Sequence, residues 1–341
     1  MRKLRILILL HEDQVPPGDR AELEGKLNER WAVFELVEAL RGLGHEVRPL
    51  GLDDELVPIR HAITGWSPHI AFNQLLDFHG AALYDAHVVS YLELLKTAYT
   101  GCNPRGILLA SDKPLAKKIL TYHRIPIPKF VVFQRGRAVR PPKKLPFPLF
   151  VKSDVEHASR GISQASIVKS ESALIERVEF IHDSIGSNAI AEQYIEGREL
   201  TVSILGNQRL TTFEPWELVF ESLPEGTAAI ATPRVKFNER YQKKLGVKTR
   251  PAELDDNKRR EVVRIAKRAY RALGMSGYGR IDFRMDAEGR IYVLEANPNP
   301  DLTPGEDLAE SSGHAGLSYP ELLQRIVTLG LAYQPAWKEI E

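Results

Sequence analysis

Four polar residues near the C-terminus are spaced so that their side chains could lie on one face of a β-hairpin. Two consecutive segments alternate apolar and polar residues and carry one pair each, Arg280 with Asp282 and Glu295 with Asn297. A two-residue turn at 288–289 would place Asp282 directly opposite Glu295. Opposed carboxylates are unfavourable unless a cation neutralises them, and Mg2+ binds carboxylates while substrate phosphates complete its shell. The pattern therefore predicts a site for a divalent metal ion and a phosphate-bearing substrate.

The other face of this hairpin is expected to be apolar and buried. Its expected members are Ile281, Phe283, Met285, Tyr292, Leu294 and Ala296. A solvated hairpin face that carries ordinary surface charges is the alternative interpretation of the polar side, because an Asp and a Glu at this spacing are common. Motifs elsewhere in the sequence are needed to choose between a metal site and a solvated face.

The composition excludes several classes of protein. The chain has 341 residues, of which 43% are hydrophobic and 27% charged, and its net charge is only +1. Nothing in this balance indicates a nucleic-acid or membrane partner. A single cysteine, Cys102, excludes an internal disulfide and a multi-thiolate zinc site and fits a reducing compartment. The apolar run Ile6–Leu10 is too short for a signal peptide and predicts a buried first strand, so we expect a cytoplasmic protein.

The first hundred residues alternate predicted strands and helices. The expected strands are Ile6–Leu10, Glu46–Leu50, His69–Asn73 and Ala98–Thr100, and the expected helices are Trp31–Leu43 and Tyr84–Leu95. A polar loop, His11–Asn28, follows the first strand. This β-α-β order predicts a small doubly wound domain with a parallel sheet.

The pattern restarts after this domain. A helix capped by Ser111 or Asp112 is expected to run to His123. Further strands are expected at Lys129–Phe133, Pro148–Lys152, Ala189–Ile195 and Leu200–Leu205, and further helices at Glu171–Ser184, Asp255–Leu273 and Tyr319–Leu329. Residues 124–148 are rich in proline and basic residues, and residues 221–250 are expected to be irregular.

Two segments could bind a nucleotide. The predicted strand that ends at Lys152 leads into a loop with Ser159 and Gly161, and lysine, hydroxyl and main-chain N–H groups are suited to phosphates. Glu192 and Glu199 flank a strand connection, where carboxylates could accept hydrogen bonds from ribose or adenine. The chain has neither Gly-x-x-x-x-Gly-Lys-Ser/Thr nor Gly-x-Gly-x-x-Gly, which disfavours a Walker-type ATPase and a dinucleotide-dependent dehydrogenase.

Four segments, taken in order, resemble the ATP-grasp superfamily and, more narrowly, its D-alanine–D-alanine ligase-like branch. They are Tyr99-Thr-Gly101 with Ser111-Asp-Lys113, Phe150-Val-Lys152 with its Ser/Gly loop, Glu192-Gln-Tyr-Ile195 with Glu199, and Arg280-Ile-Asp282 with Leu294-Glu-Ala-Asn297. The resemblance spans about residues 98–330. It implies an α/β (α+β) ATP-grasp fold with an N-terminal doubly wound parallel-sheet domain (1–100), a central small nucleotide-binding subdomain (101–190) and a C-terminal mixed-sheet subdomain with a metal site (191–335).

The resemblance implies roles for individual residues. Those expected to hold ATP are Lys113, Lys152, Ser159, Gly161, Glu192, Gln193, Ile195, Glu199 and Lys236. Those expected to hold two Mg2+ ions, or Mn2+ in their place, are Asp282, Glu295 and Asn297. Arg280 is expected to stabilise the charge that develops on the reacting carboxyl and phosphoryl oxygens. Glu29, followed by Arg30, is the candidate for the glutamate that faces the first substrate.

The implied activity is an ATP-dependent carboxylate–amine ligase that forms an amide bond through an acylphosphate. Its partners would be a small-molecule carboxylate and a small-molecule amine, and exposed strand edges in the N-terminal domain would suit a homodimer. Two alternatives remain open at this point. One is an ATP-grasp kinase that phosphorylates a small acceptor, and the other is an ATP-binding regulatory protein without ligation.

The substrate-facing segments depart from the pattern of the family. The family's Gly-Gly-x-Ser-x-Glu-x-x-Val-Ser is replaced by His-Glu-Asp-Gln-Val-Pro-Pro-Gly at 11–18, and its His-Gly-x-x-Gly-Glu-Asp-Gly is absent. Asp301 occupies the position of a glycine whose main-chain N–H serves the oxyanion. Glu306 lies near the position of a serine that holds the acceptor's carboxylate, which a second carboxylate would repel. We therefore expect the acceptor to be a diamine, a basic amino acid or the amine end of a larger molecule, unless Glu306 points to solvent and Thr303 or a later hydroxyl acts instead.

Overall fold

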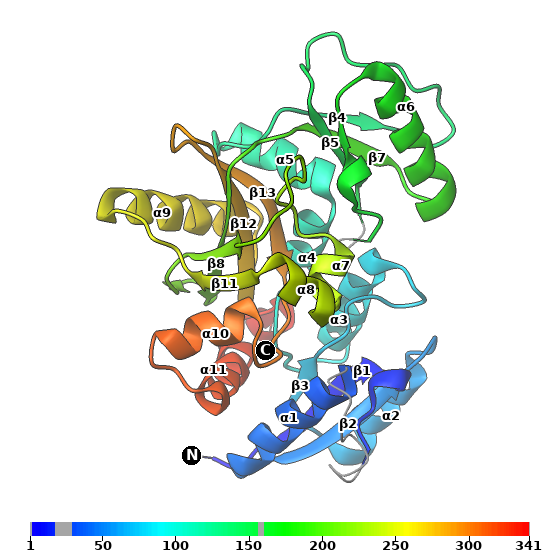
Figure 1. Cartoon of the computed structure of the whole chain (residues 1–341). Helices are drawn as coiled ribbons and strands as arrows, with labels where there is room; N and C mark the ends of the chain where they lie inside the picture. Colours follow the sequence, from blue (N-terminus) through cyan, green and yellow to red (C-terminus); the bar gives the residue numbers. More distant parts are fainter. Residues whose placement is uncertain (1, 18–28, 156–159, 341) are drawn as a thin grey trace.

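The computed structural model describes residues 2–17, 29–155 and 160–340, apart from the side chains of Glu29, Phe237, Glu339 and Ile340. Three sheets organise the chain, with the N-terminal sheet in blue, the central sheet in green and a large sheet between them (Figure 1). The mixed α/β architecture expected of an ATP-grasp fold is confirmed. Among the described residues, no helix has the length and apolarity needed to cross a membrane.

The N-terminal sheet is parallel and has the strand order β2-β1-β3. Its strands are β1 (Arg5–His11), β2 (Glu46–Leu52) and β3 (Ile70–Asn73), and its helices are α1 (Glu29–Gly42), α2 (Val57–Trp66) and α3 (Asp85–Leu94). β1 is buried from Ile6 to Leu10 because both faces of the sheet are covered. Helix α2 was not predicted. The strand predicted at 98–100 is only a single parallel bridge between Ala71 and Tyr99.

The central sheet is antiparallel and has the order β4-β7-β5-β6. It consists of β4 (Phe130–Phe133), β5 (Leu149–Ser153), β6 (Ile167–Val168) and β7 (Ala189–Gln193), and helix α6 (Glu171–Phe180) packs on it. Its hydrophobic core is separate from the core shared by the other two sheets. Helices α4 (Pro104–Ser111) and α5 (Lys113–Tyr122) precede it. Of the two predicted caps for α5, Asp112 accepts a hydrogen bond from Leu115 N.

The large sheet has the order β11-β10-β8-β12-β13, with β9 on β8. Its strands are β8 (Arg198–Leu205), β9 (Thr211–Thr212), β10 (Trp216–Phe220), β11 (Val247–Pro251), β12 (Tyr278–Met285) and β13 (Ile291–Pro298). The helices of this part are α7 (Pro233–Phe237), α8 (Glu239–Leu245), α9 (Asp256–Ala272), α10 (Asp307–His314), α11 (Tyr319–Ala332) and α12 (Ala336–Ile340). The expectation of an irregular segment at 221–250 was wrong, because α7, α8 and most of β11 lie there. The domain boundaries remain predictions.

The segment before α4 packs closely against the loop that follows β13. Asn299 Oδ1 accepts a hydrogen bond from Cys102 N at 2.6 Å, and a Cβ on Gly101 would lie 2.4 Å from the same oxygen. Gly101 also has φ +92°, a conformation that favours glycine. The loop that follows the hairpin is therefore fixed next to α4.

Candidate active site

The hairpin of β12 and β13 carries the four polar residues in the predicted pairing. Asp282 pairs with Glu295 and Arg280 with Asn297. The turn is longer than expected, since Asp286 N donates to Arg290 O and leaves 287–289 as the loop. A bulge between Asp282 and Phe283 compensates for the extra residue and restores the predicted pairs.

The bulge corrects one part of the prediction. Between the bulge and the turn, Ile291 and Val293 of β13 face the core and are 3% and 0% exposed. The prediction that Tyr292 and Leu294 belong to the buried face was wrong, because the extra residue shifts the side-chain alternation by one.

Asp282 is held by two neighbouring side chains. Arg280 donates to both of its carboxylate oxygens at 2.7 and 3.0 Å, and Asn297 Nδ2 donates to Oδ2 at 2.8 Å. Burial raises the pKa of Asp282, and Arg280 opposes this effect. Arg280 also lies 3.3 Å from the carboxylate of Asp307, at the start of α10. The sequence analysis missed Asp307, whose significance depends on a loop that could not be placed from sequence.

A buried ion network connects the hairpin to the central sheet. Lys152 Nζ lies 3.6 Å from Glu192 and 3.6 Å from Glu295, and Lys117 Nζ lies 3.3 Å from Glu192. Lys117 also donates to Leu294 O at 3.1 Å. Lys117 was missed, although it follows Lys113 by four residues and therefore lies on the same face of α5.

The network places Glu295 in a strongly positive environment. Burial alone would raise the pKa of Glu295, but Lys152, Lys113, Lys236 and Arg280 together hold it well below its ordinary value. Lys113 is 7% exposed, and burial lowers its pKa while Glu295 raises it. The structure thus brings Lys113 and Lys152, predicted for phosphates, next to Glu295, predicted for metal.

The donor set fits a divalent metal ion with oxygen ligands. Two carboxylates, Asp282 and Glu295, and the amide of Asn297 lie on one hairpin face, and Arg280 and Lys152 offset their charge. No group of three His, Cys, Asp or Glu side chains suited to a metal occurs among the residues that the structure describes. The remaining ligands would have to come from substrate phosphates and water, as is usual for Mg2+.

Comparisons with known proteins agree on one family. Residues 119–328 match the family described as the D-ala D-ala ligase C-terminus. The D-alanine–D-alanine ligase of Bordetella petrii is 33% identical over 263 residues, 74% of each chain, and that of Gluconobacter oxydans is 31% identical over 299 residues, 87% of this chain and 92% of the relative. The chain belongs to the D-alanine–D-alanine ligase family.

A solved structure agrees with the fold of the family. The D-alanine–D-alanine ligase from Bacillus anthracis complexed with ATP superposes with a TM-score of 0.73 at 23% identity, covering 96% of this chain and 98% of that one. As a member of the ligase family, the protein is an ATP-dependent enzyme that forms an amide bond and uses a divalent metal ion. The kinase and the regulatory alternatives have no support in these comparisons.

The expected nucleotide linker of the ligase is fixed on the central sheet. Gln193 N donates to Lys129 O at 2.8 Å and Tyr194 N to Pro148 O at 3.1 Å. Ile195 is 7% exposed. Contact of Gln193 and Ile195 with adenine stays a prediction, as does contact of Glu192 with the base and ribose.

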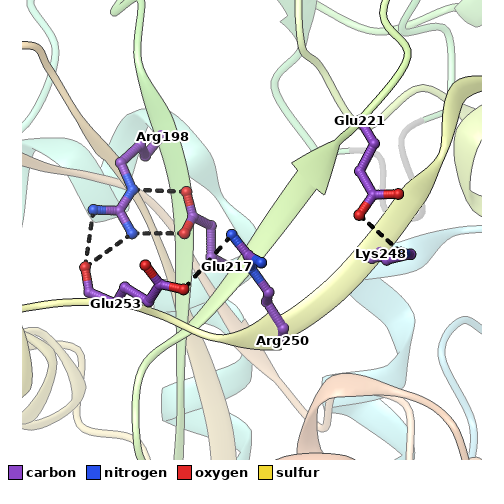
Figure 2. A network of polar contacts seen from close by, with 6 residues as sticks. All are labelled: Arg198, Glu217, Glu221, Lys248, Arg250 and Glu253. Atoms are coloured by element: carbon purple, nitrogen blue, oxygen red, sulfur yellow. Dashed lines mark hydrogen bonds and ion pairs between the residues drawn. The ribbon is translucent and has the colours of Figure 1, made fainter.

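Glu199 is held by an arginine that the sequence analysis did not single out. Arg284 donates to Glu199 at 2.7 Å and also to Gly197 O at 2.8 Å. On the neighbouring residue, Arg198 makes two hydrogen bonds to Glu217, at 2.7 and 2.6 Å, and two to Glu253 O (Figure 2). These contacts fix the start of β8 and therefore the direction of Glu199.

The network in Figure 2 continues along the outer strands of the large sheet. Arg250 of β11 lies 4.0 Å from Glu253, and Lys248 lies 2.7 Å from Glu221, which follows β10. The Lys248–Glu221 pair links the two antiparallel strands at one end, whereas Arg250 and Glu253 lie on the same segment of the chain. β11 follows α7 and α8, and α7 carries the predicted loop lysine, Lys236.

Two loops of the ligase meet next to β12. Gln164 and Ala228 exchange two hydrogen bonds, at 3.0 and 3.1 Å, and Arg284 donates to Ala229 O at 2.5 Å. The second loop leads to the exposed Lys236, whose charge acts on Glu199, Asp282 and Glu295.

The loop after Lys152 is only partly described. Gly161 has φ +76° and its carbonyl accepts a hydrogen bond from Arg177. Ser159, predicted to contact phosphate, lies outside the described residues. Glu29 begins α1, but its side chain is not described, so its predicted role is untested.

The loop after the hairpin is acidic. Asp301 accepts hydrogen bonds from Thr303 N at 2.8 Å and Thr303 Oγ1 at 2.6 Å, so the Thr303 hydroxyl is engaged within the loop. Glu306 is exposed at its surface, in line with the alternative that it points to solvent. Desolvation by the surrounding loop nevertheless raises the pKa of its carboxyl, and Asp301 and Asp307 raise it further, while Arg280 opposes them.

Proposed function

We propose that this ligase converts a small carboxylate to an acylphosphate with ATP and then transfers the acyl group to an amine that is not free D-alanine. The observation that supports the acceptor class is the acidic loop: Glu306 precedes Asp307, which faces Arg280, and Asp301 lies nearby in sequence. An acceptor carboxylate would be repelled there, whereas a second ammonium or guanidinium group would be attracted.

The arrangement of the chain's residues supports the chemistry of the first step. Lys113 and Lys152 would hold the ATP phosphates, and Lys236 would contact the phosphates from the loop that covers them. Two divalent ions, Mg2+ or Mn2+, would be held by Asp282, Glu295 and Asn297 and would neutralise charge on the phosphates. A carboxylate oxygen of the substrate then bonds to the γ-phosphorus as ADP leaves.

The second step forms the amide bond. The acceptor's amine attacks the acyl carbon, inorganic phosphate leaves, and the nitrogen loses a proton. Arg280, aligned by Asp282 and Asp307, would offset the charge that develops on the acyl oxygen. The main-chain N–H of Asp301 is the further candidate donor to that oxygen. Closure of the loops around Gln164 and Ala228 would exclude water from the acylphosphate.

The test is ADP release with ATP and Mg2+ across pairs of amino acids and diamines, with mass spectrometry of the products. We expect condensation with basic acceptors, loss of turnover in Asp282→Asn, and a gain in the use of D-alanine by Glu306→Ser. The control Glu288→Ser removes an exposed charge at the hairpin turn and should leave acceptor preference unchanged. Faster condensation with D-alanine than with any diamine or basic amino acid in the unchanged enzyme would refute the acceptor proposal.

A cytoplasmic location and a homodimer are parts of the same proposal. The need for ATP supports the location. The edge strand β2 of the N-terminal sheet supports pairing between two copies. Sedimentation equilibrium of the full chain tests the dimer, and a monomer across the accessible concentrations would refute it.

A further inference from the structure

A long basic stretch of the chain is not explained by the ligase activity. Residues 113–153 contain eleven Lys and Arg and no Asp or Glu, in a chain of net charge +1. Three of the eleven belong to the ion network and its surroundings, namely Lys113, Lys117 and Lys152. Of the other eight, Lys118 lies on the exposed side of α5, and the rest lie on the segments that precede and follow β4. A surface with this charge requires an explanation of its own.

The structure has an open groove of about 780 Å3 within this stretch. Ile125 and Leu145, both buried, form its floor, and Val131 lies beside them. Arg124, Lys129 and Lys144 are exposed and lie on its rim. None of the lining residues is acidic. The groove therefore combines an apolar floor with a positive rim.

One wall of the groove is a strand with a free edge. β4 is an outermost strand of the central sheet, and among the strands that the structure describes it pairs only with β7. Lys129 O accepts from Gln193 N, so in the antiparallel alternation Val131 and Phe133 also face β7, whereas the main-chain groups of Phe130 and Val132 face outward. Within the described part of the chain, no hydrogen bond from outside the sheet reaches these outward groups.

The groove is already shaped before any partner binds. Pro126 O accepts a hydrogen bond from Val293 N at 2.9 Å, and Lys129 O accepts from Gln193 N at 2.8 Å, so both ends of the 126–129 wall are fixed. Prolines at 126, 128 and 142 restrict the walls further and leave fewer N–H groups to occupy the strand edge. A preorganised groove loses less conformational entropy on binding.

We propose that this groove binds an extended, acidic segment of a partner protein, which adds as a further strand to the free edge of β4. The main-chain groups of the segment would pair with Phe130 and Val132. Alternate side chains would enter the apolar floor, and carboxylates would meet the three cations on the rim. A nucleic acid could use the cations but not the strand edge. This inference is independent of the substrate proposed above.

The test uses a fluorescein-labelled ten-residue peptide of alternating valine and glutamate and fluorescence anisotropy with the full-length protein. We expect saturable binding of this peptide and no binding of a matched peptide with lysine in place of glutamate. The triple variant Arg124→Glu, Lys129→Glu, Lys144→Glu should weaken binding at least about tenfold. Lys143→Glu is the matched control, because Lys143 is exposed but does not line the groove.

A second variant separates strand addition from simple charge attraction. Val132→Pro removes an outward N–H that the sheet does not use, so we expect a folded protein with weakened peptide binding. Retained ATP-dependent turnover in this variant would show that the fold is intact. The proposal is overturned if the glutamate peptide does not bind, if Val132→Pro binds it as well as the unchanged protein does, or if a uridine-rich RNA oligomer of equal length binds more tightly than the peptide.

Discussion

Replacing Lys117 with methionine tests whether the buried ion network holds the central sheet to the hairpin. Lys117 is 2% exposed, and its ammonium lies between Glu192 and Leu294 O. Loss of one partner from a buried ion pair costs about 3–5 kcal/mol, because the other charge stays buried. Lys152 still lies 3.6 Å from the same oxygen of Glu192. We therefore expect Lys117→Met to lower the free energy of unfolding by about 3 kcal/mol, the lower end of that range.

A double-mutant cycle identifies the source of this loss. Glu192→Gln removes the shared anion, and the double variant leaves neither member of the pair charged. If the pair interacts as the distances indicate, the double variant should be more stable than the sum of the single losses by about 1–3 kcal/mol. Urea denaturation measures each unfolding free energy, and an unchanged slope with denaturant would show that the unfolded states are comparable.

The exposed neighbour Lys118 provides the control. Lys118→Met changes the same residue type on the same helix, and we expect it to alter stability by less than about 0.5 kcal/mol. Lys117→Met should also weaken ATP binding in calorimetry. Without Lys117, Glu192 would attract Lys152 more strongly, and Lys152 would be less available to the ATP phosphates. A loss below about 1 kcal/mol in Lys117→Met together with additive single effects would refute the reasoning.

Three further predictions concern other parts of the chain. Burial raises the pKa of Asp85 from 3.8 to about 7, so the stability that its protonated form contributes is present in acid and is lost as pH rises from about 4 to about 7. In urea denaturation, Asp85→Asn should therefore be more stable than the unchanged protein by about 4 kcal/mol at pH 8 and should lose most of that advantage by pH 4. Gln164→Ala removes both hydrogen bonds to Ala228 and should increase ADP release without amide product, measured by comparing the two yields. Asp307→Asn removes one of the two carboxylates that align Arg280. It should lower kcat about tenfold and change ATP affinity, measured by calorimetry, only slightly.

Local pattern was sufficient to predict the hairpin and its polar face. Alternation, a Glu-Gly turn and four polar residues determined the pairing of Asp282 with Glu295, which the structure confirms. The pairing is nevertheless reached by a longer turn and a bulge that offset each other. The sequence does not reveal the bulge, because an extra residue in one strand changes side-chain direction without changing composition. The wrong assignment of Tyr292 and Leu294 to the core follows from this alone.

Contacts between distant segments were beyond the sequence analysis. β11 pairs with β10 along residues such as Lys248 and Glu217, which in isolation have the composition of a solvated segment. Asp307 gains its significance only because the loop after β13 returns its carboxylate to Arg280. Lys117 was accessible in principle from its spacing to Lys113, but its burial depends on how α5 packs on β13 and β7. In each case the missing information was tertiary.

The charges of the site explain why one lysine is central to the ligase. Lys152 balances Glu192 on the central sheet and Glu295 on the hairpin at the same time. A nucleotide brings negative phosphates, and the divalent ion that accompanies it brings positive charge to Glu295. We therefore expect Lys152 to pair with a phosphate in place of Glu295 when the nucleotide binds, while Glu295 pairs with the divalent ion. The net charge of the buried site then changes little, and no buried charge is left unpaired. Because Lys152 and Glu295 lie on different sheets with separate cores, this exchange also couples nucleotide binding to the approach of the two sheets.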